Sequence, residues 1–185
     1  MSRPVRAVFL DRDGVLNQAI IRNGKPYPPR NLQELKLLPG VREALAALKQ
    51  NGFRLIVVTN QPDVARGAQS KETVEEIHAY LRRELPLDDI LTCWHDRDGA
   101  CNCRKPQPGL LLAARDRYGI DLRQSFLVGD RWRDVEAGRQ AGCRTIFLDY
   151  HYDEPRPATP PDACATCLRE AADWILSQND LPPAE

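Results

Sequence analysis

The sequence has no excess of either charge and no long apolar run, and both absences exclude classes of protein. Its 185 residues carry 26 Lys and Arg against 26 Asp and Glu, so the formal net charge is zero. No overall field therefore attracts nucleic acid or an anionic membrane, and an anionic partner has to be held by local groups. No apolar stretch approaches the roughly 20 residues of a membrane helix, and residues 1–6 lack the apolar segment of a signal peptide. We expect a cytoplasmic protein that binds neither nucleic acid nor membrane.

Short apolar runs alternate with amphipathic segments along the chain. The runs predict strands over residues 7–10, 54–58, 90–93, 126–128 and 145–148. The segments between them predict helices between residues 40 and 51 and over 70–85, 108–118 and 135–141. This alternation is typical of an α/β fold with a doubly wound, Rossmann-like parallel sheet. A chain of this length is long enough for one such domain and short for two, so we predict a single domain over residues 1–185.

Two Pro-rich segments interrupt this pattern. Residues 17–38 predict an extended surface loop, which can cover a reactive site. Residues 153–161 predict a linker, followed by a C-terminal helix over residues 164–178.

The most informative motif is a pair of aspartates, Asp11 and Asp13, directly after the first apolar run. Gly14 lets the chain turn sharply there, so both carboxylates are expected at the tip of a buried strand. Two negative charges held a few Å apart repel each other unless a cation or a shared proton compensates them. Mg²⁺ prefers oxygen ligands and meets this requirement.

Polar side chains also follow later strands. Thr59 and Asn60 end the second predicted strand, and Asp130 and Asp134 follow the fourth. Lys105 stands just before a predicted helix. Ligands of doubly wound sheets bind outside the carboxyl ends of the strands, so we expect these groups to meet at one site.

Such a site suits phosphoryl transfer through an aspartyl-phosphate. We assign Asp11 as the nucleophile and Asp13 as the acid and base that protonates the leaving oxygen and then activates water. Thr59 and Lys105 would stabilise the transferring phosphoryl group, and Asp130 would add a carboxylate to the metal site.

A cysteine-rich loop, residues 93–103, precedes Lys105. It contains two short motifs of metal-ligating residues, Cys93 with His95 and Cys101 with Cys103. Together these four side chains can close a tetrahedral Cys3His shell around zinc. Because protein would fill all four positions, this Zn²⁺ would be structural and would fix the loop that leads into the lysine. The alternative is a redox loop or cysteines without a ligand.

The segments DRDGVLN, VVTNQ, CRKPQPG and GDRWRD resemble the four motifs of the haloacid dehalogenase superfamily of phosphatases, over about residues 5–150. TNQ followed by ARG, and the cysteine-rich loop, resemble the branch that contains histidinol phosphatases and heptose-bisphosphate phosphatases. The resemblance implies the zinc site and a catalytic Mg²⁺ held by Asp11, the main-chain carbonyl of Asp13, and Asp130. Asp134 would orient the lysine or a metal-bound water and is a further candidate ligand.

The substrate is less clearly indicated, and the candidate substrate-binding residues are Asn60, Arg66, Arg104 and Arg131. Arg104 suits a second phosphate, although Arg66 and Arg104 could also only line a solvated rim. The short cysteine loop and Arg131 resemble histidinol phosphatases, whereas CRKPQPG resembles the heptose enzymes. No insertion is large enough for a cap domain, so residues 12–38 and the zinc loop are expected to frame the pocket.

We therefore expect a monomeric phosphatase of a small-molecule phosphate ester. D-glycero-D-manno-heptose 1,7-bisphosphate is the favoured substrate, and histidinol phosphate or another sugar phosphate is the alternative. A binding protein without turnover is disfavoured because no motif group is missing. A zinc-ribbon module for nucleic acid is disfavoured by the zero net charge. Nothing in the sequence excludes a phosphotransferase.

Overall fold

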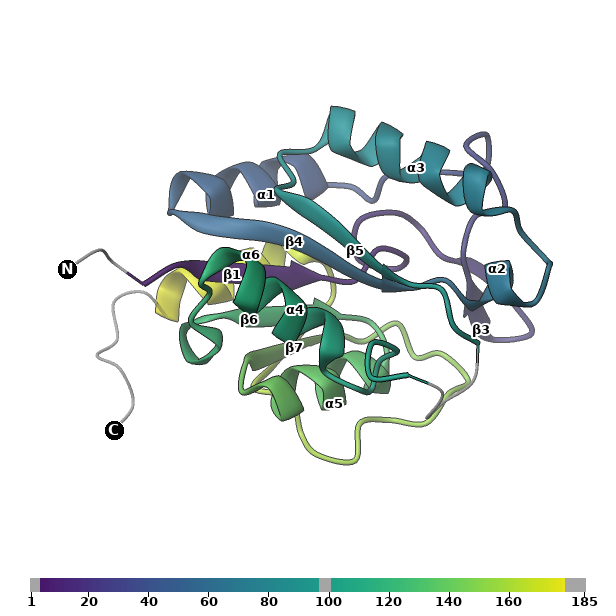
Figure 1. Ribbon diagram of the computed structural model, residues 1–185. Coiled ribbons are helices and arrows are strands. Elements are labelled where there is room, and N and C mark those ends of the chain that lie inside the picture. The colour runs from purple at the N-terminus through teal and green to yellow at the C-terminus, as the bar shows by residue number, and fades with distance from the viewer. Residues whose placement is uncertain (1–3, 97–100, 179–185) are drawn as a thin grey trace.

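A computed structural model describes residues 4–96 and 101–178 of the protein. Within that part of the chain, six strands form one parallel sheet in the order β5-β4-β1-β6-β7-β8, which confirms the predicted doubly wound fold (Figure 1). The strands are β1 (Arg6–Leu10), β4 (Phe53–Asn60), β5 (Asp89–Cys93), β6 (Phe126–Gly129), β7 (Arg144–Leu148) and β8 (Ala163–Ala165). β1 is an interior strand. The residues that follow it therefore lie near the middle of the row formed by the carboxyl ends of the strands.

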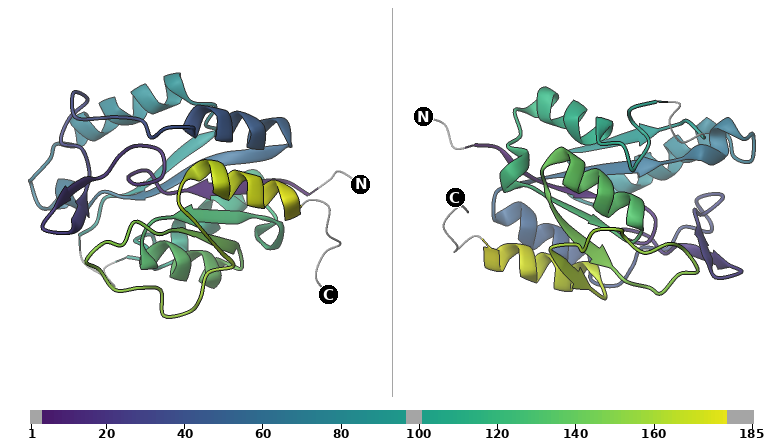
Figure 2. Two further views of the ribbon diagram at one scale, coloured as in Figure 1. Left: turned by 180° about the vertical axis from the view of Figure 1, so that it is seen from behind. Right: turned by 90° about the horizontal axis from the view of Figure 1, so that it is seen from below.

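Helices cover both faces of the sheet (Figures 1 and 2). One face carries α1 (Val41–Gln50), α3 (Lys71–Glu84) and α6 (Leu168–Ser177), and the other carries α4 (Gly109–Tyr118) and α5 (Trp132–Ala141). The side chains of β1 alternate between these layers: Val8 and Leu10 pack in the first, and Ala7 and Phe9 in the second. All four are fully buried, which explains why β1 is an unbroken apolar run.

The helix ends follow local signals in the sequence. The Ser70 hydroxyl accepts a hydrogen bond of 3.1 Å from the Thr73 amide at the start of α3. Gly119 and Gly142 end α4 and α5 in the left-handed conformation, with φ of 65° and 84°. A short 3-10 turn, Leu122–Gln124, leads into β6.

The prediction of an extended surface loop over residues 17–38 is wrong in part, because most of the segment lies at the surface but is not all loop. This segment contains an antiparallel hairpin of β2 (Ile20–Arg22) and β3 (Lys25–Tyr27), and Asn17 at its start is fully buried. The strands are only three residues long, too short to show an alternating pattern in the sequence. A short helix, α2 (Pro62–Ala65), was also not predicted.

The prediction of a C-terminal helix over residues 164–178 is wrong at its start. Residues 163–165 form β8, which pairs in parallel with β7, and α6 begins only at Leu168. The Asp162 carboxylate accepts a 2.7 Å hydrogen bond from the Thr145 amide and so directs the chain along the edge of the sheet. Residues 153–161 contain no helix or strand, as predicted for a linker.

The sequence also predicts neither a cap domain nor a membrane-spanning helix. No large cap domain is present in the parts of the chain described above. No helix within residues 4–96 and 101–178 combines the length and the apolar character needed to cross a bilayer.

Candidate active site

Three carboxylates and one ammonium group meet at the carboxyl ends of the central strands. Oxygens of Asp11, Asp130 and Asp134 lie within 4.8 Å of one another. Lys105 Nζ contacts Asp11 Oδ1 at 3.0 Å and Asp134 Oδ1 at 2.5 Å, and it donates to the Val58 carbonyl at 2.8 Å. The structure therefore brings together groups that the sequence places in four separate segments.

The single ammonium group of Lys105 does not balance the three carboxylates of this cluster. Burial raises the pKa of Asp11 to about 6, although the nearby Lys105 ammonium lowers it. Burial and the charges of Asp11 and Asp134 also raise the pKa of Asp130 well above its usual value. Both carboxylate oxygens of Asp130 are buried, and the nearby Tyr152 hydroxyl is a neutral donor that does not balance their charge. Hard oxygen donors with unsatisfied negative charge fit a divalent cation such as Mg²⁺.

Gly14 allows the chain to pass very close to this cluster. Its φ is 84°, and a Cβ at this position would lie 1.9 Å from Asp130 Oδ2. Any side chain here would displace the Asp130 carboxylate, so the turn after Asp13 requires glycine for both its conformation and its space.

Asp13 has a different environment from Asp11. The Arg12 guanidinium donates from Nε to both Asp13 oxygens at 3.2 Å, and Asn17 Nδ2 donates to Oδ1 at 2.9 Å. Gln61 Nε2 donates to Oδ2 at 3.0 Å. Burial alone would raise the pKa of Asp13, but the Arg12 charge and these hydrogen bonds hold it below the usual value of 3.8. Asp13 is therefore ionised in the resting protein.

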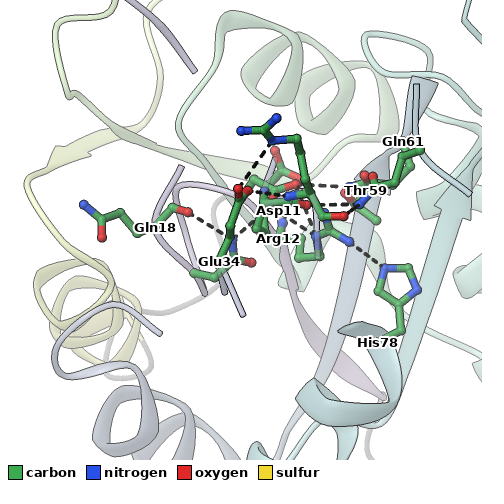
Figure 3. Close-up of polar contacts among 12 residues, drawn as sticks. Asp11, Arg12, Gln18, Glu34, Thr59, Gln61 and His78 are labelled. Carbon is green, nitrogen blue, oxygen red and sulfur yellow. Dashed lines mark hydrogen bonds and ion pairs between the residues drawn. The ribbon is translucent and has the colours of Figure 1, made fainter. Parts of the chain in front are cut away.

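Sequence reasoning missed the partners of Asp13. It placed Arg12 in the frame of the pocket, whereas Arg12 is fully buried and its Nη1 lies 3.1 Å from Nε2 of His78, a residue of α3 (Figure 3). The Gln61 amide also donates to Thr59 Oγ1 at 2.9 Å. Gln61 could have been found from its place in VVTNQ, but nothing local in the sequence marks His78.

His78 provides a test of this buried arrangement. Burial, followed by the Arg12 charge, lowers its pKa to about 3. Because a guanidinium only donates, the neutral Nε2 has to accept, and protonation would leave two cations in contact. The unfolded chain binds this proton near pH 6.5 and the folded chain only near pH 3, so the free energy of unfolding falls as the pH drops through this window.

We expect His78→Gln to weaken this pH dependence. In the parent protein His78 contributes up to about 1.4 kcal/mol per pH unit between pH 6 and pH 4. Glutamine keeps an acceptor for Arg12 but does not titrate there, so urea denaturation at pH 7, 6, 5 and 4 should give a shallower slope. His151→Gln is the matched control because that imidazole is exposed. An unchanged slope in His78→Gln would contradict the assignment.

A cavity of about 280 Å³ opens above the carboxylates. The candidate substrate-binding residues all line it: Asn60, Arg66, Arg104 and Arg131. Residues 25–28, which include β3, line it as well, as expected for the segment after β1, whereas no described residue of the zinc loop lines it. Glu154 and Arg133 also contribute to its wall and were not predicted.

The four candidates have different partners. Asn60 uses both ends of its amide on the Lys105 main chain, at 3.0 and 3.1 Å, and so positions the lysine. Arg66 pairs with Asp63 at 3.2 Å and with Asp96. Arg104 is buried and donates to a main-chain carbonyl of the cysteine loop at 3.1 Å, whereas Arg131 pairs with Glu154.

The four predicted zinc ligands lie together at the end of β5. Cys103 Sγ is 3.2 Å from Cys93 Sγ, 3.3 Å from Cys101 Sγ and 3.4 Å from His95 Nδ1. These sulfur distances are too long for a disulfide and close to the edge of about 3.8 Å expected for a tetrahedral zinc–thiolate site. The donor set therefore fits zinc. Residues 97–100 of the predicted loop lie outside the described residues.

Comparison with known proteins places this chain in a family. A family model of haloacid dehalogenase-like hydrolases matches residues 28–142. The chain belongs to the haloacid dehalogenase-like hydrolases. Relatives named D-glycero-beta-D-manno-heptose-1,7-bisphosphate 7-phosphatase include one from Escherichia coli K12, which is 36% identical over all of this chain and 95% of its own length. One from Vibrio cholerae is 37% identical over 80% of this chain and 82% of its own length.

Solved structures agree with this family. This hydrolase superposes with a TM-score of 0.79 on D,D-heptose 1,7-bisphosphate phosphatase from B. bronchiseptica, described as complexed with magnesium and phosphate. The two are 30% identical over 94% of this chain and 99% of the other. The corresponding protein from Burkholderia thailandensis gives a TM-score of 0.64 at 26% identity, over 93% of this chain and 99% of the other.

Proposed function

We propose that this hydrolase is a Mg²⁺-dependent phosphatase that hydrolyses D-glycero-D-manno-heptose 1,7-bisphosphate at C7, within one domain that spans residues 1–185. The observation that carries the proposal is the 36% identity, over the whole chain, to relatives named for this reaction. The arrangement of charged groups around Asp11 supports the same chemistry.

Asp11 is the proposed nucleophile. The Arg12 amide donates to its Oδ1 at 2.8 Å and Lys105 contacts the same oxygen at 3.0 Å, so the carboxylate is held in a fixed orientation. An Asp11 oxygen attacks the phosphorus, and the bond from phosphorus to the sugar oxygen breaks. Water then attacks the aspartyl-phosphate, which breaks the bond to Asp11 and releases inorganic phosphate.

Asp13 is the proposed proton carrier. A phosphate dianion bound beside Asp13 is a like charge that raises its pKa, so this carboxylate can take up a proton when substrate binds. It gives that proton to the leaving sugar oxygen and later removes one from the attacking water. Arg12, Asn17 and Gln61 hold the side chain in place for both steps.

Asp11, the main-chain carbonyl of Asp13, and Asp130 would hold Mg²⁺. The ion supplies positive charge that offsets the buried carboxylates and the phosphate oxygens. Asp134 contacts Lys105 through Oδ1 and accepts from the Arg131 amide at 3.0 Å through Oδ2, so we assign it to positioning the lysine. Thr59 and Lys105 would bind the transferring phosphoryl group.

Cys93, His95, Cys101 and Cys103 would hold a structural Zn²⁺. The chain passes from this cluster directly into Arg104 and Lys105. A metal at the cluster would therefore restrict the segment that carries the catalytic lysine.

We expect phosphate release to depend on Mg²⁺ and to favour the heptose bisphosphate. With Mg²⁺, kcat/KM should be at least about tenfold higher for heptose 1,7-bisphosphate than for fructose 1,6-bisphosphate or histidinol phosphate, because each unmatched polar contact costs about 1.4 kcal/mol or more. Chelation with EDTA should remove activity, and added Mg²⁺ should restore it. A preference for histidinol phosphate would replace the proposed substrate, and transfer of phosphate to an added alcohol would identify a phosphotransferase.

A further inference from the structure

Residues 149–162 reach the pocket through Glu154 and contact two other segments beside it. The Asp153 amide donates to the Gly24 carbonyl, at the turn between β2 and β3, over 2.8 Å. A Cβ at Gly24 would lie 2.9 Å from the Asp153 Cβ, so the turn packs closely on this residue. The hairpin that lines the pocket is thus docked on Asp153, and the next residue, Glu154, faces the pocket itself.

Glu154 holds the guanidinium of Arg131 with both carboxylate oxygens. Arg131 Nε donates to Oε2 at 2.8 Å, and Nη2 contacts Oε1. The Glu154 side chain is only 14% exposed, whereas that of Arg131 is 36% exposed and that of Lys105 is 2% exposed. Lys105 therefore forms the floor of the site and Arg131 its outer wall.

This pair is suited to hydroxyl groups. The contact with Glu154 uses Nε and Nη2, which leaves Nη1 to donate, and each Glu154 oxygen keeps a lone pair that can accept. A sugar hydroxyl both donates and accepts, so it can bind to both members of the pair at once. A phosphate dianion gains little at this position, because the Glu154 charge offsets that of Arg131.

Glu154 also determines where the Arg131 side chain points. Without it, the guanidinium would lie near the negative charges of Asp130 and Asp134, which already act on it. The buried negative charge of Asp130 would attract it. Glu154 thus keeps Arg131 at the wall and away from the proposed metal site.

We infer that Arg131 and Glu154 form one recognition element for the hydroxyl groups of a polyol phosphate, with Glu154 as the positioning residue. The inference rests on the proposed phosphatase function, and it assigns to that site a determinant of its substrate class. The element selects hydroxylated substrates and takes no part in breaking the phosphate ester.

The test compares heptose 1,7-bisphosphate with p-nitrophenyl phosphate, whose leaving group bears no hydroxyl besides the ester oxygen. In Glu154→Ala the ratio of the two kcat/KM values should fall at least tenfold, mainly through a higher KM for the sugar. Glu154→Gln should cause a smaller fall, because the amide oxygen still accepts from Arg131. Glu154→Ala in an Arg131→Ala background should change the ratio less than Glu154→Ala does in the parent, because Glu154 then has no guanidinium to position and only its own contact with a hydroxyl is lost.

A matched control is Glu84→Ala, which removes a glutamate that pairs with Arg42 at 2.7 Å and does not line the pocket. It should leave the ratio unchanged. An unchanged ratio in Glu154→Ala would overturn the inference while the phosphatase stands. So would a higher ratio, which would show that Glu154 repels the substrate, or an equal loss on both substrates, which would show that the pair supports the phosphoryl chemistry and does not recognise hydroxyl groups. A parent protein that hydrolyses neither ester would overturn the proposed function and this inference with it.

Discussion

Asp11→Asn should lower kcat for phosphate release by at least roughly 10³-fold, because an amide oxygen is a poor nucleophile and forms no stable acyl phosphate. The loss should be equally severe for heptose bisphosphate and p-nitrophenyl phosphate, since both pass through the same covalent step. Stopped assays with the purified variant at saturating Mg²⁺ measure it directly. Asp116→Asn is the matched control, because Asp116 is an exposed carboxylate that pairs with its neighbour Arg115 and lies outside the pocket.

The same variant should stay folded. Lys105 keeps Asp134 at 2.5 Å, and removing the Asp11 charge relieves repulsion with Asp130. The thermal midpoint without Mg²⁺ should therefore be at least equal to that of the parent. Turnover within tenfold of the parent would refute Asp11 as the nucleophile, and an unfolded variant would show that this carboxylate is structural.

Cys101→Ser should lose zinc. Purified parent protein should contain roughly one zinc ion per chain, and the variant should bind zinc at least roughly 100-fold more weakly, because three ligands do not close a tetrahedral shell. The thermal midpoint should fall by about 5–10 °C, since metal binding contributes to folding. Metal analysis and a thermal melt test both parts.

Cys164→Ser is the control for the zinc prediction, because Cys164 is exposed and lies outside the cluster. Phosphatase activity of Cys101→Ser should fall less than that of Asp11→Asn, because the cysteine loop supports Lys105 without touching the reacting atoms. Full zinc occupancy in Cys101→Ser would contradict the ligand set.

Local patterns in the sequence were sufficient for the central part of the fold. The run before Asp11 is apolar on both faces because β1 is covered by helices on both sides, and such a strand leaves a recognisable sequence. The two motifs of the cysteine cluster are also recognisable, because the ligands within each motif are close together in the chain. The catalytic roles of these groups remain proposals, although the structure brings all of the groups to the carboxyl ends of the strands.

Very short strands, and charged residues whose partner is distant in the chain, were not predictable. β8 and the strands of the hairpin have three residues each, and so few positions cannot show a period. Glu154 stands in a Pro-rich segment that resembles a solvated linker. Only its contact with Arg131, 23 residues earlier in the chain, distinguishes it from an exposed glutamate.

The sequence by itself determined the alternation of the longer strands and helices, the carboxylates after β1 and the donors of the cysteine cluster, because each of these depends on residues that are close in the chain. The tertiary structure alone decided which charges are paired. Arg12 is joined to His78 across 66 positions, and Lys105 to Asp134 across 29. Whether a buried charge finds a partner depends on distance in space, and the one-dimensional pattern of residues does not contain that distance.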